Sequence, residues 1–186
     1  MPSSFPESIP YLIQFIRKNR PDFKSVLDVG LGFGKGGFLL REYFDVSQYQ
    51  RFQPQDWKIK IVGVEIFKDY ISDLQKMIYN KIIIGDIFKV LPNLGKFDIA
   101  LLNDIIEHFP KEGGLRLIKE VFNHADDIFI TTPYGFFEHP ARGKNKHEEH
   151  KSGWKIEDLK EFRIIDKVLI PRIFNKEEIL MAYLRK

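Results

Sequence analysis

Short apolar runs alternate with amphipathic segments along most of the chain. The apolar runs are rich in β-branched residues and have the length typical of buried strands. Segments with helical spacing lie between most of them, for example at 67–79 and 111–125, and 10–19 predicts a helix before the first strand. Alternating strands and helices indicate a mostly parallel sheet with helices on both faces. The predicted strands are SVLDVG, KIVGVEI, NKIIIGDI, FDIALLND, DIFITTP, FRIIDKVLI and EEILMAYLRK.

The C-terminal part of the chain departs from this alternation. The last two predicted strands are joined by the short segment PRIFNK, which favours an antiparallel final strand. Two other segments, 45–57 and 134–154, match neither a helical nor a strand period. The second is polar and leaves the carboxyl end of the fifth strand, where open α/β sheets bind their ligands. We therefore expect 134–154 to cover a ligand site as a lid.

The composition fits one globular domain over 1–186. The 186 residues are 44% hydrophobic and 30% charged, so the chain can bury a core and keep a polar surface. The net charge of +3 is spread along the chain and does not favour a nucleic-acid surface, although a small basic patch stays open. The absence of cysteine excludes disulfides and thiolate nucleophiles. Without a signal-peptide pattern or a membrane-length apolar run, we expect a cytoplasmic protein with no membrane insertion.

Glycines follow the first predicted strand in the stretch VLDVGLGFGKGG. A glycine turn at the carboxyl end of a parallel strand lets a ligand approach the backbone and the next helix N-terminus. Gly30, Gly32 and Gly34 occupy this position, and the first of them comes two residues after Asp28. The dinucleotide fingerprint G-x-G-x-x-G lacks such an acid, although a dinucleotide site that uses Gly37 stays open as an alternative. A tight turn without any ligand would show the same glycines.

Two more acidic residues end the next two predicted strands. Glu65 closes KIVGVE, where its carboxylate can accept hydrogen bonds from both hydroxyls of a ribose. Asp86 closes IIIGD, where it can accept from an exocyclic adenine amine. Glu65 could instead cap the helix that follows it. Together with Asp28, these residues put acids at three successive strand ends and favour a nucleoside ligand.

At these residues the chain resembles the class I S-adenosylmethionine-dependent methyltransferases. VLDVGLGFG, VGVEI, GDIF and FDIALLNDIIEHF are similar to their first, ribose, adenine and fourth-strand motifs. The resemblance covers nearly the whole chain and implies a Rossmann-like α/β fold, with a seven-stranded, mostly parallel sheet and an antiparallel last strand. It also implies S-adenosyl-L-methionine as the cofactor. The implied contacts are Asp28, Gly30, Gly32 and Gly34 with the methionine end, Glu65 and Ile66 with the ribose, Asp86 and Ile87 with the adenine, and Asn103 with the neighbouring wall.

Methyl transfer from a sulfonium asks little of the protein beyond alignment and exclusion of water, with a base where the acceptor must lose a proton. Asp104 and His108 in NDIIEHF and His150 in the lid segment are the expected catalytic residues. Glu107 and His108 could instead cap and brace the local helix. The histidines of the lid segment could equally belong to a solvated, charged loop.

The spacing of Asp104, Glu107 and His108, followed by a later histidine before Trp154, is similar to a metal-assisted branch of the same family. That branch includes small-RNA 2′-O-methyltransferases and quinone-pathway O-methyltransferases. Two carboxylates and two histidines would suit a hard or borderline divalent ion. The preferred interpretation nevertheless uses no metal, because these ligands would have to converge from two separate segments.

The acceptor is less constrained than the cofactor. The fourth strand ends in NDII and not in an N-P-P-Y motif, and no basic stretch is interleaved with aromatic residues. A small-molecule acceptor methylated at oxygen or nitrogen is therefore preferred. A metal-assisted RNA 2′-O- or quinone-type enzyme, a nucleic-acid or protein methyltransferase aided by a partner, and a nucleotide-binding module without catalysis stay open. The sequence leaves the oligomeric state undetermined.

Overall fold

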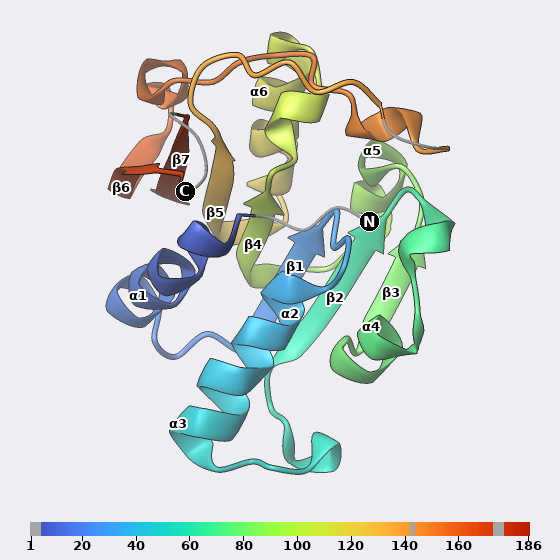
Figure 1. Ribbon diagram of the computed structural model, residues 1–186. Coiled ribbons are helices and arrows are strands. Elements are labelled where there is room, and N and C mark those ends of the chain that lie inside the picture. The colour runs from blue at the N-terminus through green and yellow to red at the C-terminus, as the bar shows by residue number, and fades with distance from the viewer. Residues whose placement is uncertain (1–4, 142–143, 173–176) are drawn as a thin grey trace.

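The computed structural model describes residues 5–141, 144–172 and 177–186. These residues form one seven-stranded sheet in the order β3-β2-β1-β4-β5-β7-β6 (Figure 1). Strand β7 is antiparallel to both of its neighbours, whereas the pairs among β1 to β5 are parallel. The expected fold class is confirmed. The strands are β1 Ser25–Val29, β2 Lys60–Glu65, β3 Lys81–Ile84, β4 Phe97–Asn103, β5 Ala125–Pro133, β6 Arg163–Pro171 and β7 Glu178–Arg185.

Helices cover both faces of the sheet, with α1, α2 and α4 on one face and α5 and α6 on the other (Figure 1). The helix before the first strand is present, and the two helical segments between later strands are also found, although 67–79 is split into two short pieces. The α-helices are α1 Ile9–Asn19, α2 Lys35–Leu40, α3 Ser47–Tyr49, α4 Asp73–Ile78, α5 Ile87–Val90 and α6 Lys111–Val121. The 3₁₀ and π turns are η1 Pro6–Ser8, η2 Arg41–Val46, η3 Pro54–Asp56, η4 Lys68–Tyr70, η5 Leu91–Asn93, η6 Ile106–His108, η7 Lys146–Glu148 and η8 Ile156–Leu159.

The strands are apolar on both faces because each face packs against helices. Along β4, Ile99 and Leu101 pack into the core beneath α1 and α2, while Ala100 and Leu102 pack into the core beneath α6. This alternation follows from the two-residue period of a strand. The continuous apolar runs of the sequence therefore reflect two separate cores on a single sheet.

The two segments without a clear period fold differently from each other. Residues 45–57 extend the helix α2 through the π turn η2 and α3 and then return to β2 through η3. The described parts of the lid segment, 134–141 and 144–154, cross above the sheet, in orange in Figure 1, and the two ends of the segment meet where Tyr134 and Gly135 pair with Trp154. Trp154 is fully buried, and the absence of a side chain at Gly114 makes room for its ring.

The connection between β6 and β7 includes residues 173–176, which lie outside the described residues. The antiparallel final strand that this short connection favours is present, since β6 and β7 are antiparallel neighbours. Among the residues that the structure describes, no helix has the length and apolar character needed to cross a membrane.

The strand order reverses between β1 and β4, which are neighbours at the centre of the sheet. After β1 the chain continues to β2 and β3 at one edge, and after β4 it continues to β5, β6 and β7 toward the other edge. In open α/β sheets such a reversal opens a crevice at the carboxyl ends of the strands, where ligands bind. The glycines follow β1 and the segment NDIIEHF follows β4, so the topology brings both to this crevice.

Candidate functional site

A cavity of about 580 Å³ lies at the carboxyl ends of the parallel strands. This volume is within the range of small-molecule sites in proteins. Residues of the lid segment and Phe5 also line it. Gly34 is the one predicted site residue that does not line the cavity. The predicted residues that do line it are Asp28, Gly30, Gly32, Glu65, Ile66, Asp86, Ile87, Asn103, Asp104, His108 and His150.

The glycine turn has the left-handed backbone that its sequence predicts. Gly30, Gly32 and Gly34 have φ values of 67°, 50° and 86°, which side chains disfavour. A side chain at Gly30 would also overlap the side chain of Ile105. Gly34 is the N-cap of α2, so its role is to begin that helix.

Asp28 is buried beneath this turn and hydrogen-bonded to a residue that sequence reasoning did not identify. The hydroxyl of Tyr79 donates to Asp28 Oδ2 over 2.5 Å. Burial raises the pKa of Asp28 to about 7, and the Tyr79 hydrogen bond partly offsets this effect. Asp28 can therefore gain or lose its proton near neutral pH.

Close neighbours explain the two glycines in the first turn of helix α2, and for Gly37 this neighbour is Tyr79. The backbone N–H of Gly37 donates to the Tyr79 hydroxyl over 3.1 Å, and a side chain at Gly37 would overlap the Tyr79 ring. A side chain at Gly36 would be squeezed between Asp28 and Asn103. Gly37 thus accommodates Tyr79, which accounts for its presence without a dinucleotide.

Glu65 is held in a fixed orientation at the end of β2. Its Oε2 accepts from the N–H of Gly32 at 3.0 Å, and its Oε1 accepts from the N–H of Phe67 at 2.9 Å. Each carboxylate oxygen has a second lone pair that a ribose hydroxyl can use. Burial raises the pKa of Glu65, and these backbone donors counteract it. Glu65 therefore joins the glycine turn to β2 and also faces the cavity.

Asp86 has the capping role that was considered for Glu65. Its Oδ1 accepts from the N–H of Phe88 over 2.9 Å, which makes it the side-chain cap of α5. A cap of this kind fixes the carboxylate at the helix N-terminus. Asp86 and Ile87 both border the cavity, so this fixed carboxylate is placed to meet a ligand.

Asp104 follows β4 in an unusual backbone conformation. Its φ is +53°, and its carboxylate accepts from Thr131 Oγ1 over 3.0 Å. The N–H of Phe5 is a further donor to this carboxylate. Removal from water raises the pKa of Asp104 to about 6, although Thr131 and the cations Lys35 and Arg172 favour the charged form. Non-glycine residues in this conformation cluster at functional sites.

Glu107 is buried on the turn η6 with one carboxylate oxygen unsatisfied. Thr132 Oγ1 donates to Glu107 Oε2 over 3.0 Å, whereas Oε1 has no hydrogen-bond partner among the described residues. Burial and the nearby Asp104 raise the pKa of Glu107 well above its usual value. An unsatisfied buried oxygen is costly, so this one calls for a specific explanation.

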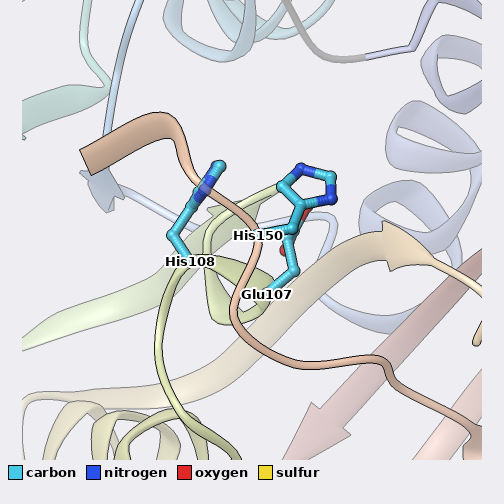
Figure 2. A group of neighbouring side chains, drawn as sticks. All are labelled: Glu107, His108 and His150. Atoms are coloured by element: carbon cyan, nitrogen blue, oxygen red, sulfur yellow. The ribbon is translucent and has the colours of Figure 1, made fainter. Parts of the chain in front are cut away.

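Two histidines stand beside Glu107, as Figure 2 shows. His108 comes from η6 and His150 from the lid, and their ring centroids are 5.1 Å apart. Burial lowers the pKa of both histidines, that of His150 to about 4, while backbone carbonyl groups partly oppose the shift. His139 packs against His150 with ring centroids 5.0 Å apart. His139 and His150 therefore pack against each other on the cavity wall, whereas the side chain of His147, on the same lid, is exposed.

One potential ligand atom from each of Glu107, His108 and His150 lies within 4.8 Å of the other two. The convergence of two separate segments, which the sequence could not predict, is therefore present. Asp104 does not belong to this group, so the alternative set of two carboxylates and two histidines that the spacing had left open is not assembled.

Contacts between the lid and the cofactor side of the cavity were also missed from the sequence. The Tyr70 hydroxyl donates to Glu148 on the lid and accepts from the side-chain amide of Asn145 over 3.1 Å. Gln75 Nε2 donates to the carbonyls of Tyr70 and Gly32. The position of Tyr70 shortly after Glu65 was the available signal, because residues after a parallel strand lie at the ligand edge.

The fold is that of several solved methyltransferase structures. An S-adenosylmethionine-dependent methyltransferase from Clostridium acetobutylicum ATCC 824 is 15% identical, with a TM-score of 0.65 over 98% of this chain and 92% of that chain. The N-methyltransferase NodS from Bradyrhizobium japonicum WM9 is 12% identical, with a TM-score of 0.64 over 97% and 94%. Magnesium protoporphyrin IX methyltransferase from Synechocystis PCC 6803, with S-adenosylmethionine bound, is 16% identical, with a TM-score of 0.63 over 97% and 79%.

No protein-family model matches the chain, and the search of curated protein sequences found no match. The likeness to the solved structures extends over nearly the whole chain. The chain has the Rossmann-like fold of the class I S-adenosylmethionine-dependent methyltransferases.

Proposed function

We propose that this protein transfers a methyl group from S-adenosyl-L-methionine to an oxygen or nitrogen atom of a small-molecule acceptor. The observation that carries this proposal is the arrangement of Asp28, Glu65 and Asp86 around one cavity beside the glycine turn. The spacing of these acids along three neighbouring strands suits the three parts of an adenosyl-amino-acid ligand. A dinucleotide is less well matched, because Gly37 is already in contact with Tyr79.

The residues of the cavity suit the separate groups of this cofactor. Asp28 presents a carboxylate near the methionine end, where an ammonium group would favour its charged form. Glu65 has lone pairs left for the ribose hydroxyls, and Asp86 is fixed at the N-terminus of α5 for the adenine. Glu65 and Asp86 can keep their hydrogen bonds to backbone N–H groups when they contact the cofactor.

The bound cofactor supplies an electrophilic methyl group on a sulfonium, so the protein has mainly to align the acceptor and exclude water. The lid segment and Phe5 close the cavity on the acceptor side. Asp104, His108 and His150 border this side and could take the proton that an acceptor hydroxyl or amine releases. Burial lowers the pKa of both histidines, which keeps them neutral and able to accept.

The cavity volume of about 580 Å³, with residues of the lid segment in its wall, favours a small acceptor over a polymer. Among solved structures of this fold, the didemethyltoxoflavin N1-methyltransferase from Burkholderia thailandensis holds its small-molecule substrate together with S-adenosylhomocysteine. Magnesium protoporphyrin IX is the named substrate of another. These proteins support the substrate class, and the acceptor of this chain has to be found by experiment.

Two measurements test the proposal separately. Calorimetric titration with S-adenosylmethionine and S-adenosylhomocysteine tests the cofactor site, and ligand at a hundred times its dissociation constant should stabilise the fold by about 2.7 kcal/mol. A screen for transfer of labelled methyl groups into metabolite and RNA pools then tests the acceptor class. No binding of either compound at millimolar concentration would refute the cofactor assignment. Labelling confined to RNA would refute the small-molecule acceptor.

A further inference from the structure

The group formed by Glu107, His108 and His150 has a chemistry that methyl transfer from a sulfonium does not require. Glu107 and His108 lie on η6, directly after β4, and His150 lies on the lid segment (Figure 2). We infer that these three residues bind a divalent first-row transition-metal ion at the acceptor side of the cavity. This inference goes beyond the proposed function, because the site and its test do not depend on methyl transfer.

Glu107 provides the first argument. Its side chain is 2% exposed, and Oε1 has no partner among the described residues, while Oε2 is held by Thr132. A buried carboxylate oxygen that lacks a hydrogen bond loses the solvation that it has in water. A metal ion within reach of Oε1 would replace that solvation, and two potential nitrogen ligands are within 4.8 Å.

The orientation of the two imidazole rings provides the second argument. Nδ1 of His108 is 3.2 Å from the carbonyl oxygen of Glu149, and Nδ1 of His150 is 2.8 Å from that of Phe137. When Nδ1 carries the hydrogen in each ring, it donates to these carbonyls and Nε2 keeps its lone pair. Metal-binding histidines are commonly fixed in this way, with one ring nitrogen bound to a carbonyl and the other free for the ion.

The backbone holds the two segments together without the ion. The N–H groups of Lys151 and Ser152 donate to the carbonyl oxygen of Glu107 over 2.7 and 3.2 Å. The residue after His150 is thus anchored to the same residue that supplies the carboxylate. The three side chains are therefore brought together by the fold, and an ion would add to an existing arrangement.

The ligand set indicates which ions fit. Two imidazole nitrogens and one carboxylate are typical of zinc and iron sites that keep positions open, whereas Mg²⁺ and Ca²⁺ prefer oxygen ligands. Asp104, whose inclusion would make the set more oxygen-rich, is outside the group. All three ligands line the same cavity as the glycine turn, so the open positions would face the acceptor.

Titration of the tag-free, chelator-treated full chain with Co²⁺ tests the inference, because its visible absorption reports the ligands directly. We expect one ion per chain, with d–d bands, and weaker binding of Mg²⁺ by at least about tenfold. Glu107→Gln and His150→Ala should each weaken Co²⁺ binding by at least about tenfold. His147→Ala is the matched control, since it removes a histidine of the same lid that is not part of the group, and it should leave Co²⁺ affinity unchanged.

Three results would overturn the inference. They are no Co²⁺ binding at millimolar concentration, binding that neither variant weakens, and an equal or stronger preference for Mg²⁺. Loss of binding in His147→Ala as well would refute this ligand set. Because a buried substitution could unfold the chain, the thermal transition and S-adenosylhomocysteine affinity of each variant are measured in parallel. If Glu107→Gln is unfolded, the half-buried His150→Ala decides the outcome alone. Failure of metal binding would leave the methyltransferase proposal intact.

Discussion

The hydroxyl of Tyr79 donates a 2.5 Å hydrogen bond to the buried carboxylate of Asp28. The same hydroxyl accepts from the N–H of Gly37, so it connects the end of β1 to the first turn of α2. Tyr79 is itself almost fully buried and directly follows α4. One side chain therefore links three elements around the glycine turn, which suggests that it positions Asp28 for the cofactor.

Replacing Tyr79 by Phe should destabilise the protein and weaken S-adenosylmethionine binding. The variant keeps the ring that packs against Gly37 but leaves a buried carboxylate and a backbone N–H without this partner. Loss of such a buried hydrogen bond costs about 1–3 kcal/mol. Urea unfolding and calorimetric titration measure the two effects. Tyr49→Phe, at a half-exposed tyrosine in α3, is the control and should change neither quantity.

Asp28 should make the stability of the unliganded protein depend on pH. Burial raises its pKa to about 7 from the usual value of 3.8, so the folded state holds its proton over a range in which the unfolded state has lost it. The free energy of unfolding therefore falls as the pH rises from about 4 to 7, and the cost is fully present above pH 7. Asp28→Asn should remove this pH dependence, which amounts to a loss on the order of 4 kcal/mol in the free energy of unfolding over that pH range.

The measurement is urea unfolding of wild type and Asp28→Asn at several pH values, compared as a difference so that other titrating groups cancel. A pH-independent difference between the two proteins would contradict the raised pKa. Binding of the cofactor's ammonium group should favour ionised Asp28, so wild-type affinity should rise as the pH passes 7. Asp28→Asn should lose that rise.

The sequence predicted the residues whose position follows from strand order alone. Asp28 lies one residue before the end of β1, Glu65 ends β2 and Asp86 comes two residues after β3. Parallel strands place their carboxyl ends at one edge of the sheet. Tyr79 could not be found in this way, because its hydroxyl reaches Asp28 from a helix end that is distant along the chain. Asp86 accepts from the nearby N–H of Phe88 and also borders the cavity. Since the same position serves helix capping and ligand contact, the sequence pattern could not tell these two roles apart.

The acceptor side was harder to predict because it depends on the path of the lid segment. The sequence could not show that 134–154 folds back on itself through Trp154, or that Glu107 accepts from the backbone next to His150. The unsatisfied oxygen of Glu107 is also invisible in the sequence, because it depends on which neighbours surround a buried side chain. Motif spacing suggested Asp104 as a companion of Glu107, whereas the left-handed backbone at Asp104 directs its carboxylate to Thr131.

Gly32→Val should abolish cofactor binding. Gly32 has a φ of +50°, which a β-branched residue disfavours, and its N–H and carbonyl are both engaged, by Glu65 and Gln75. A shift of this backbone would move the carboxylate of Glu65 as well. Calorimetric titration with S-adenosylhomocysteine is the measurement. Gly95→Val is the control, since a side chain there meets open space, and unchanged affinity in both variants would mean that the glycine turn does not touch the ligand.

Tyr70→Phe should loosen the lid segment. The Tyr70 hydroxyl contacts Asn145, which directly precedes the turn η7 of the lid, and Glu148, which ends it, and Phe cannot replace either contact. Fewer restraints lower the free energy of local opening, so backbone amides of 144–152 should exchange hydrogen faster. Hydrogen exchange followed by mass spectrometry measures this, with Tyr11→Phe as the control. Equal exchange in both variants would show that the Tyr70 contacts do not restrain the lid.

Asp104→Asn should lower methyl transfer while leaving S-adenosylmethionine affinity within about twofold, if the carboxylate accepts the acceptor's proton. Asparagine is the informative replacement because it tolerates the left-handed backbone of Asp104, with its φ of +53°, and can still accept from Thr131. The variant therefore removes the charge and basicity but keeps the fold, and removing a general base typically costs about 10²–10⁴-fold in rate. Transfer rate with a confirmed acceptor and calorimetric cofactor affinity are measured on the same preparation, with the exposed Asp56→Asn as the control. A wild-type transfer rate in Asp104→Asn would assign Asp104 to the structure of the turn after β4, and His108 and His150 would then be candidates for the base in the metal-free protein alone.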